Sequence, residues 1–573
     1  MSFSIVRRNV AVTPAMLPDE LHPVLRRVYA ARDVASADDY AYSLEHLLPL
    51  TALGGLPAAV GLLQAVLADH GRILVVGDFD ADGATSCALC VRALRAMGAT
   101  DVHYLVPNRF EYGYGLTPEI VEVAAQFNPA LIMTVDNGVA SIEGVAAARQ
   151  RGIKVLVTDH HLAGKTLPAA DAIVNPNLPG DPFPSKYLAG VGVAFYVMLS
   201  LRARLRECGW FDRQGIDEPN LAQYLDLVAL GTVADVVPLD RNNRILVQQG
   251  LLRIRAGRCV PGILALLEVG KRNPASAVAE DLGFAVGPRL NAAGRLDDMS
   301  LGIECLLADD AATAGNMAQQ LDALNRDRRE IEADMQAQAV TALESLDLSA
   351  THLPTGLCLF DSGWHQGVIG ILAARIRERY HRPVIAFARS DEGEVKGSAR
   401  SVPGLHIRDV LDAVATRHPG LVRKFGGHAM AAGLTLAETD YPAFAEAFDT
   451  EVSRQLSSDE LATVIWSDGE LAASELSLDT AQQLRAAGPW GQGFPAPVFD
   501  GEFRVLAQRV VGGRHLKLSL EAVSGGTRMD AIAFNTPALP AGCDCARMAY
   551  RLDVNEYRGL VSPQLVVEYI ETG

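Results

Sequence analysis

The sequence predicts an α/β protein of several domains, in which a parallel sheet comes first and a small β-barrel comes last. Between about residues 70 and 180, short apolar runs alternate with helical segments. A second alternation of this kind begins near residue 355, and short strands separated by Gly- or Asn-containing turns dominate after about 460. The 573 residues are enough for about three to four domains.

The apolar runs of the first region are continuous rather than alternating, which is typical of strands buried on both faces of a parallel sheet. We expect helices between them near 84–97, 117–126 and 142–150, and strands near 72–79, 101–107, 130–136, 154–159 and 172–175. In such sheets, ligands bind at the carboxyl ends of the strands. The sequence therefore predicts that any site lies where these five runs end.

The remaining segments follow in a simple order. We expect residues 1–50 to form an arm and residues 51–300 to form the first domain. Within this domain we expect helices to about residue 260, followed by an irregular stretch that carries Arg289 and Arg295. Residues 301–350 contain no internal proline and predict a long connecting helix or a helix pair. Residues 351–457 form a second, smaller α/β domain. Residues 458–573, with five or six short strands, suit a small barrel of the OB type.

Composition limits the possible functions without choosing one. With 49% hydrophobic and 21% charged residues the chain is globular, and its net charge of −17 requires any nucleic-acid contact to come from local basic patches. Cys87 and Cys90 form a CxxC spacing within an expected helix, with no second pair to complete a zinc site, so we interpret them as reduced packing residues. The first residues contain no apolar h-region, so we expect no secretory signal, and the longest apolar run, 189–201, is too short to cross a bilayer. We expect a cytoplasmic protein without a membrane partner.

Acidic and imidazole side chains gather where the expected strands end. They are Asp78, Asp80 and Asp82 after the first run, Asp136 after the third, and His160 and His161 after the fourth, with Asp235 further along the chain. Carboxylates brought to one sheet edge repel one another unless cations lie between them. Oxygen ligands with one imidazole suit Mn²⁺ or Mg²⁺ better than structural zinc. Two such ions about 4 Å apart clamp both oxygens of a phosphoryl displacement. The alternative for a single aspartate is a helix N-cap, which would leave the two histidines unexplained.

Three motifs carry a family resemblance. Asp159-His160-His161, preceded by the GDFDADG and TVDNG segments and followed by Ala234-Asp235, resembles the DHH phosphoesterase superfamily. The GWHQGVIGILAARI segment, GSARS and the FGGHAMAAG run at 425–433 resemble its accessory DHHA1 domain. Within the superfamily, the Pro107-Asn108-Arg109 segment and the terminal barrel resemble the single-strand-specific 5′ exonucleases. The resemblance covers nearly the whole chain.

The resemblance implies a two-ion site and a role for each ligand. Asp82, Asp136, His160 and Asp235 would hold one ion, and Asp80 with the bridging Asp136 would hold the second. Related pyrophosphatases have a histidine at the position of Val76, so Asp78, water or substrate would complete the second site. His161 would contact the scissile phosphate. We therefore expect catalytic roles for Asp82, Asp136, His160 and His161.

A second set of residues is expected to select the 5′ end. Arg109, Ser398 and Arg400 offer the guanidinium and hydroxyl donors that a terminal phosphate needs. The turn at Gly426, Gly427 and His428 could present backbone N–H groups and an imidazole to the same nucleotide, or could simply end a strand. Arg289 and Arg295 are candidate cations along the DNA backbone; the alternative is that they are solvated surface arginines.

The function that follows is degradation of single-stranded DNA from its 5′ end, by two-metal hydrolysis that releases 5′-mononucleotides in DNA repair and recombination. The alternatives are a DHH-type oligonucleotide or cyclic-dinucleotide phosphodiesterase and a non-catalytic DNA-binding scaffold. The resemblance also implies a single-strand-binding protein and a DNA helicase as partners, and we expect a monomer.

Overall fold

A computed structural model describes most of the chain in two compact units. The described residues are 3–10, 17–107, 115–345, 354–390, 393–427, 429–456, 463–540, 542–557 and 559–572. One unit comprises residues 7–324 and 467–573, and the other comprises 1–6 and 325–466. No single helix among these residues is long and apolar enough to cross a membrane, although one bent pair, Leu44–Ala52 with Leu56–Ala68, meets the length and composition test.

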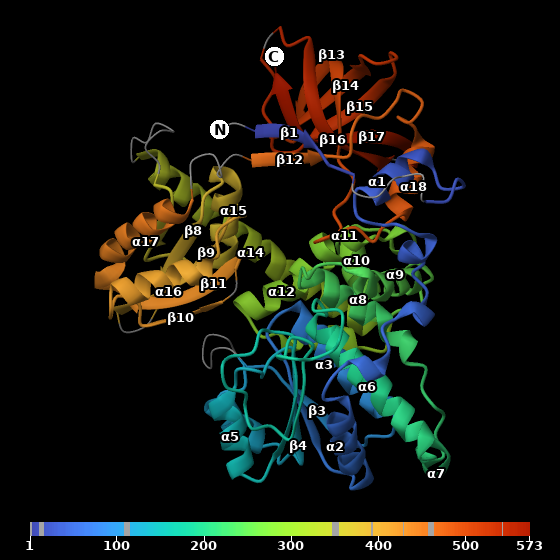
Figure 1. Ribbon diagram of the computed structural model, residues 1–573, viewed down its shortest axis with the longest axis vertical. Coiled ribbons are helices and arrows are strands. Elements are labelled where there is room, and N and C mark those ends of the chain that lie inside the picture. Colours follow the sequence, from blue (N-terminus) through green and yellow to red (C-terminus); the bar gives the residue numbers. More distant parts are fainter. Residues whose placement is uncertain are drawn as a thin grey trace. The chain divides into compact units, whose positions relative to one another are not determined.

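A five-stranded parallel sheet organises the larger unit, as predicted (Figure 1). Its strand order is β3-β2-β4-β5-β6, with β2 (Ile73–Val76), β3 (Val102–Leu105), β4 (Leu131–Val135), β5 (Lys154–Thr158) and β6 (Ala172–Val174). Alternate residues of each strand face opposite layers: Leu74 and Val76 pack with one group of helices, and Ile73 and Val75 with the other. This two-sided burial explains the uninterrupted apolar runs.

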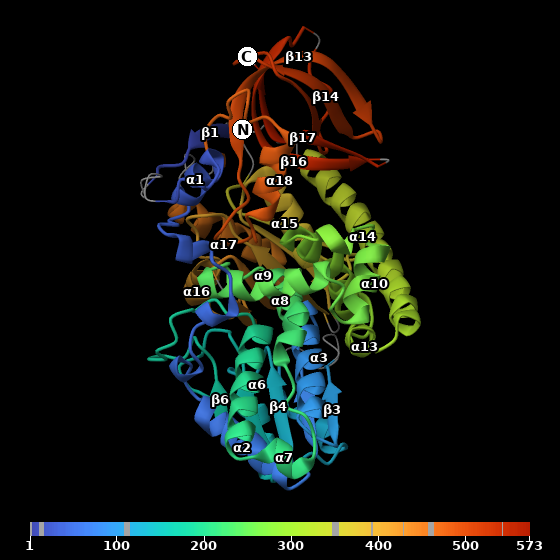
Figure 2. The same cartoon turned by 90° about the vertical axis from the view of Figure 1, so that its right-hand side faces the viewer.

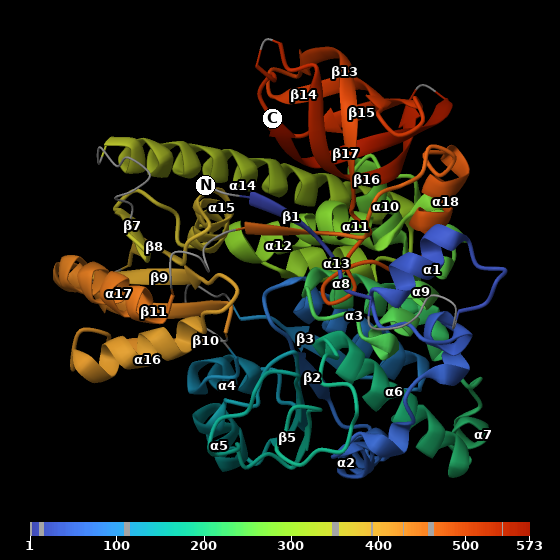
Figure 3. The same ribbon diagram turned by 45° about the horizontal axis from the view of Figure 1, so that its top comes forward.

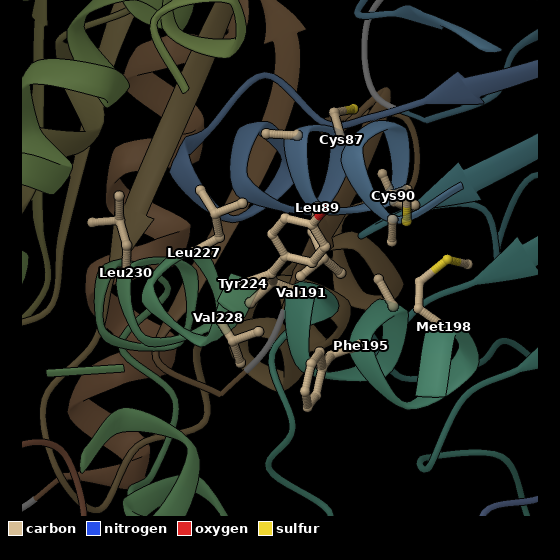
Figure 4. Close-up of a cluster of buried hydrophobic side chains, with 14 of the residues drawn as sticks. Cys87, Leu89, Cys90, Val191, Phe195, Met198, Tyr224, Leu227, Val228 and Leu230 are labelled. Atoms are coloured by element: carbon tan, nitrogen blue, oxygen red, sulfur yellow. The ribbon is translucent and has the colours of Figure 1, made fainter. Parts of the chain in front are cut away.

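Helices cover both faces of this sheet. One face packs against α4 (Pro118–Ala125) and α5 (Ile142–Gln150). The other packs against α2 (Leu56–Ala68), α3 (Ala81–Ala96) and α6 (Gly190–Glu207), and α6 lies alongside β4 in Figure 2. Cys87 and Cys90 of α3 are free and buried in this core (Figure 4). Their interpretation as packing residues is confirmed.

The chain between the sheet and the smaller unit is helical. It contains α7 (Trp210–Gln214), α8 (Leu225–Ala234), α9 (Arg241–Arg255), α10 (Pro261–Val269), α11 (Ala279–Asp281), a π-helix (Leu282–Val286), α12 (Gly287–Leu296), α13 (Ser300–Leu307) and α14 (Ala311–Ser345). The irregular stretch expected around Arg289 and Arg295 is wrong, because residues 279–296 are helical. Its glycines and proline suggested a loop, but Pro288 lies in the first turn of α12, where proline is tolerated, and the glycines allow close helix packing. The helix pair expected at 301–350 is present, and α14 is one long helix in Figure 3.

The smaller unit contains a mixed sheet of order β10-β11-β9-β8-β7. Its elements are β7 (Leu357–Asp361), α15 (Ile369–Tyr380), β8 (Val384–Arg389), β9 (Glu394–Arg400), α16 (Ile407–Arg417), β10 (Lys424–Gly427), β11 (Ala431–Ala437) and α17 (Tyr441–Gln455). Among its described strands, β7 and β8 pair in parallel and the other pairs are antiparallel.

The C-terminal segment forms a closed five-stranded barrel, as predicted. Its order is β13-β14-β15-β17-β16, with β13 (Phe499–Val511), β14 (His515–Ala522), β15 (Arg528–Ala533), β16 (Cys545–Tyr557) and β17 (Leu560–Thr572); α18 (Leu478–Ala486) and the arm helix α1 (Pro23–Ala30) add to its core. The strand expected at residue 463 is real but lies outside the barrel: β12 (Thr463–Ser467) pairs with β1 (Phe3–Arg7). Figure 1 shows this pair.

Candidate active site

The acidic side chains predicted at the strand ends meet at one edge of the parallel sheet. Asp136 directly follows β4, and His160 follows β5 after one residue. The Oδ1 atom of Asp136 lies 3.1 Å from Nε2 of His160. Asp235, which ends α8, places its Oδ2 atom 3.6 Å from the same nitrogen. Three elements distant in sequence therefore converge on one imidazole.

The possible metal-binding atoms fall into overlapping groups. In each group the atoms lie within 4.8 Å of one another, and the three groups are Asp82–His160–Asp235, Asp78–Asp80–Asp136 and Asp136–His160–His161. Asp136 belongs to two of them, as expected of a bridging carboxylate. Asp78 joins Asp80 and Asp136 in one of these groups and adds a third carboxylate there.

These carboxylates are poorly stabilised as anions by the protein alone. Burial, followed by the charges of Asp235 and Asp80, raises the pKa of Asp82 well above its usual range. Burial and the charge of Asp82 do the same to the pKa of Asp136. Burial and Asp80 raise the pKa of Asp235 to about 7. Cations between them would remove this mutual repulsion.

The backbone holds two of these carboxylates in fixed positions. Asp82 accepts hydrogen bonds from the N–H groups of Gly190 (2.6 Å) and Val191 (2.9 Å), in the first turn of α6. A Cβ atom at residue 190 would lie 2.5 Å from the Cβ atom of Asp136, so only glycine fits there. Asp136 itself has a φ of 61°, a left-handed conformation that few residues other than Gly, Asn and Asp adopt. The backbone thus fixes where these two carboxylates lie.

Asp159 has a different role from its neighbours. It accepts hydrogen bonds from the N–H groups of Val139, His160 and His161 and from Nδ1 of His161 (2.8 Å). Burial opposes its ionisation, but these hydrogen bonds and the charge of His161 lower its pKa. Burial likewise opposes protonation of His161, and the contact with Asp159 outweighs it and raises the pKa of His161 to about 9. The contact with Asp159 thus orients the His161 ring beside the acidic cluster.

The donor set fits hard divalent cations. It consists of carboxylate oxygens with one or two imidazoles and no thiolate, which is the chemistry of Mn²⁺ and Mg²⁺ sites. The buried Oδ2 atom of Asp235 accepts no hydrogen bond from the described residues. Since buried oxygen atoms are usually hydrogen-bonded, a bound cation would explain this one.

The smaller unit carries a basic group of residues. Arg400 and Ser398 lie on β9, and Arg400 donates to the Ser398 hydroxyl (3.2 Å). A Cβ atom at Gly370, in the first turn of α15, would lie about 3 Å from both side chains, so they border the N-terminus of that helix. Burial and the charge of Arg377 lower the pKa of Arg400, and no carboxylate of the described residues pairs with it. A partly buried guanidinium and a helix N-terminus together attract an anion.

The expected glycine turn lies on the same sheet. Gly426 and Gly427 end β10, and Gly426 and Ser398 both pair with Gly433 of the intervening β11, so one row of the sheet joins them. Gly427 has a φ of 141°, and a Cβ atom there would lie 2.4 Å from the carbonyl oxygen of Ala431, so the chain requires glycine. Arg109 and His428 lie outside the described residues.

The expectation for Arg289 is corrected. Its side chain is buried, donates to the carbonyl oxygen of Ala285 (2.6 Å) and pairs with Asp322 (2.8 Å). It is neither a cation available to DNA nor a solvated surface residue, but an internal tie between α12 and α14. Arg295, at the other end of α12, is only partly buried.

Sequence reasoning missed the amide groups of α6 and the helix terminus beside Arg400. Nothing in the GVGV segment at 190–193 signals that its N–H groups hold Asp82, apart from the glycine that allows the approach. The contact of Gly370 with Arg400 likewise joins residues 30 positions apart.

Comparisons with known proteins agree with this geometry. Family models match residues 72–232 (DHH family, N-terminal domain), 353–454 (DHHA1 domain) and 467–569 (RecJ OB domain). Proteins named single-stranded-DNA-specific exonuclease RecJ are 59% identical in Dickeya dadantii, over 98% of both chains, and 56% identical in Escherichia coli, over 99% of this chain and 98% of that one. The crystal structure of RecJ in complex with Mn²⁺ from Thermus thermophilus superposes with a TM-score of 0.79 at 31% identity, covering 97% of this chain and 76% of that chain.

The fold and the acidic site therefore define a DHH-type protein with accessory DHHA1 and OB domains. The sequence identity to the relatives extends along nearly the full length of the chain and identifies the family within this class. The chain belongs to the RecJ family.

Proposed function

We propose that this protein is a metal-dependent exonuclease that degrades single-stranded DNA from the 5′ end and releases 5′-mononucleotides in DNA repair and recombination. The observation that carries the proposal is the convergence of Asp82, Asp136 and Asp235 on His160, with Asp78 and Asp80 completing a second group. The names of the relatives specify single-stranded DNA as their substrate.

The ligand roles follow from the two groups. Asp82, Asp136, His160 and Asp235 would hold one Mn²⁺ or Mg²⁺ ion, and Asp80, Asp136 and Asp78 the other. When bound, such a pair activates water and neutralises charge on a transferring phosphoryl group. Asp159 orients the His161 ring, and His161 would donate to a nonbridging oxygen of the scissile phosphate.

Selection of the 5′ end is assigned to the smaller unit. Arg400, Ser398 and the first turn of α15 would bind the terminal phosphate, with Gly426, Gly427 and His428 at the same nucleotide. Arg109, of the larger unit, is a separate candidate for a phosphate contact. This pocket distinguishes an end from an internal phosphodiester because a terminal phosphate carries an additional charge.

The cellular setting follows the same family membership. We propose that the protein works in the cytoplasm as a monomer, with a single-strand-binding protein and a DNA helicase as partners. Both partners would supply the unpaired strand that the enzyme requires.

The test uses 5′-phosphorylated single strands labelled at either end, with Mn²⁺ and a blunt-duplex control. We expect mononucleotides from the 5′ label, progressive shortening of the 3′-labelled strand and an intact duplex. A strong preference for a dinucleotide would favour the oligonucleotide phosphodiesterase. Intact single strands in the presence of Mn²⁺ would favour the non-catalytic scaffold.

A further inference from the structure

An exposed aromatic side chain lies on a helical irregularity next to the metal-binding residues. Phe284 is 71% exposed, more than any other large aromatic side chain among the described residues. It belongs to the π-helix at 282–286, between α11 and α12. Short π-helical segments occur frequently at functional sites, because the extra residue redirects side chains.

The helix that carries Phe284 is attached to both metal-binding segments. Oδ1 of Asn291 accepts a hydrogen bond from the N–H group of Ala81 (2.8 Å), the residue between Asp80 and Asp82. At Gly287 a Cβ atom would lie 3.1 Å from that of Ala234, which precedes Asp235. The π-helix and α12 therefore run along the acidic cluster.

One stripe of this helix is accessible. Its members recur at helical spacing, with mostly buried residues between them, and are Phe284, Pro288, Asn291 and Arg295. At 1.5 Å per residue, Phe284 lies about 10 Å along the helix from Asn291. That distance corresponds to about three nucleotides when bases are stacked at 3.4 Å per step. An aromatic side chain thus lies within reach of the first nucleotides of a strand whose phosphate is at the metal site.

A second apolar side chain is exposed on the neighbouring segment. Val236 directly follows Asp235, is 64% exposed and has a φ of 64°. A β-branched residue in the left-handed region is strained, and such strain persists mainly at functional sites. Val233 of the same segment lies 3.2 Å from the Cβ position of Gly283, which precedes Phe284. Two exposed apolar side chains thus lie on adjoining segments beside the cluster.

We propose that Phe284 stacks on a nucleobase of the single strand, close to the scissile phosphate, and so helps to select unpaired DNA. This inference rests on the proposed exonuclease function. A base can stack on a protein ring only after it leaves its own duplex stack, and such stacking accepts any base. Phe284 would therefore favour single strands without imposing a sequence.

The test compares the wild type, Phe284→Ala, Phe284→Trp and a matched control, Leu252→Ala, in which another exposed apolar side chain of the same unit is removed. First-nucleotide release is measured on 5′-phosphorylated single strands, each with one abasic residue at positions one to five. On the intact strand, we expect Phe284→Ala to lower kcat/KM about five- to 100-fold, mainly through KM, while Phe284→Trp and Leu252→Ala stay near wild type. When the abasic residue replaces the base that stacks on Phe284, kcat/KM of the wild type should fall by the same factor. At that position the wild type and Phe284→Ala should therefore have equal kcat/KM.

The proposal is overturned if Phe284→Ala matches the wild type on the intact strand, or if its relative loss is the same at every abasic position. Failure of the underlying function would look different, because the wild type itself would then leave the intact strand uncut. An equal increase in the thermal unfolding midpoint on adding Mn²⁺ to the wild type and Phe284→Ala shows that the metal site is retained.

Discussion

Buried carboxylates at the barrel and at the sheet edge of the larger unit have pKa values shifted in opposite directions. Asp500, at the start of the barrel, accepts hydrogen bonds from Arg7 (3.0 Å), Arg547 (3.0 Å) and Ser467. Burial opposes its ionisation, yet these contacts lower the pKa of Asp500 to about 2. At the sheet edge, Asp82 and Asp136 lie among other acids, and their pKa values are raised.

The difference separates a structural acid from a metal-binding one. The barrel and the arm supply guanidinium groups, so Asp500 contributes to folding without any ligand. The sheet edge supplies backbone amides and imidazoles, and its acids lie chiefly among one another. Burial of a carboxylate therefore says little about its role until its partners are known.

The largest effect is expected when one carboxylate at the sheet edge is replaced by a neutral amide. Asp136→Asn keeps a residue type that tolerates the left-handed backbone, so the fold should survive. We expect kcat on single-stranded DNA to fall at least about 10³-fold, because the bridging ligand of both ions is lost and with it several kcal/mol of transition-state stabilisation. Binding to single-stranded DNA should be largely retained.

The matched control is Asp171→Asn. Asp171 lies just before β6 and accepts a hydrogen bond from Val155 at the start of β5 (2.8 Å), at the opposite edge of the same sheet. Its removal should leave kcat within about twofold, since it is remote from the reacting phosphate. Near-normal turnover by Asp136→Asn would remove the metal assignment.

The barrel side of the comparison is tested by pH. Because the folded pKa of Asp500 is about 2, below the value near 3.9 of an unfolded chain, its stabilising contribution is complete above about pH 4. It is lost as the pH falls from about 4 to 2. The free energy of unfolding of the wild type should therefore exceed that of Asp500→Asn by about 2 kcal/mol at neutral pH, and this excess should disappear at low pH.

Urea unfolding of both proteins between about pH 7 and 2.5 measures this excess across the window in which the carboxyl titrates. Asp500→Asn should still cleave DNA under conditions in which it is folded, because Asp500 belongs to none of the metal-binding groups. A difference in stability that does not change with pH would mean that the ion pairs with Arg7 and Arg547 contribute nothing through the charge of Asp500.

Features that depend on residues close in sequence could be predicted from the sequence, whereas features that depend on contacts between distant residues could not. The parallel sheet follows from local apolar runs, and the acidic edge follows because the carboxyl ends of parallel strands share one edge. The barrel follows from its strand spacing. These features needed no knowledge of which distant residues touch.

Features that depend on distant contacts were missed. Arg289 was expected to face solvent, but Asp322 of α14 pairs with it. The helical run at 279–296 was expected to be irregular, because its glycines break helices in isolation yet permit close packing against Phe79 and Ala234. The amides that hold Asp82 come from a helix 108 residues away.

The smallest expected effect concerns the arginines of the two units, one of which has a carboxylate partner and one of which does not. Arg547 is paired with Asp500, whereas Arg400 is partly buried without a carboxylate partner among the described residues. Arg400→Ala should raise KM about tenfold for strands with a 5′-phosphate and leave KM for 5′-hydroxyl strands nearly unchanged, because one charge-assisted contact to the terminal phosphate is lost.

Arg389→Ala is the control for this variant, since Arg389 is exposed on β8 of the same sheet and pairs with Glu438. Its KM should not depend on the state of the 5′ end. Equal increases for both kinds of end in Arg400→Ala would refute the phosphate pocket.

The pairing of β1 with β12 has a consequence for how the molecule is made. Residues 3–7 are synthesised long before their partner strand at 463–467, with most of the chain between them. Contacts of such long sequence separation form slowly and late. Residues 3–7 therefore remain without their partner strand until most of the chain has been translated.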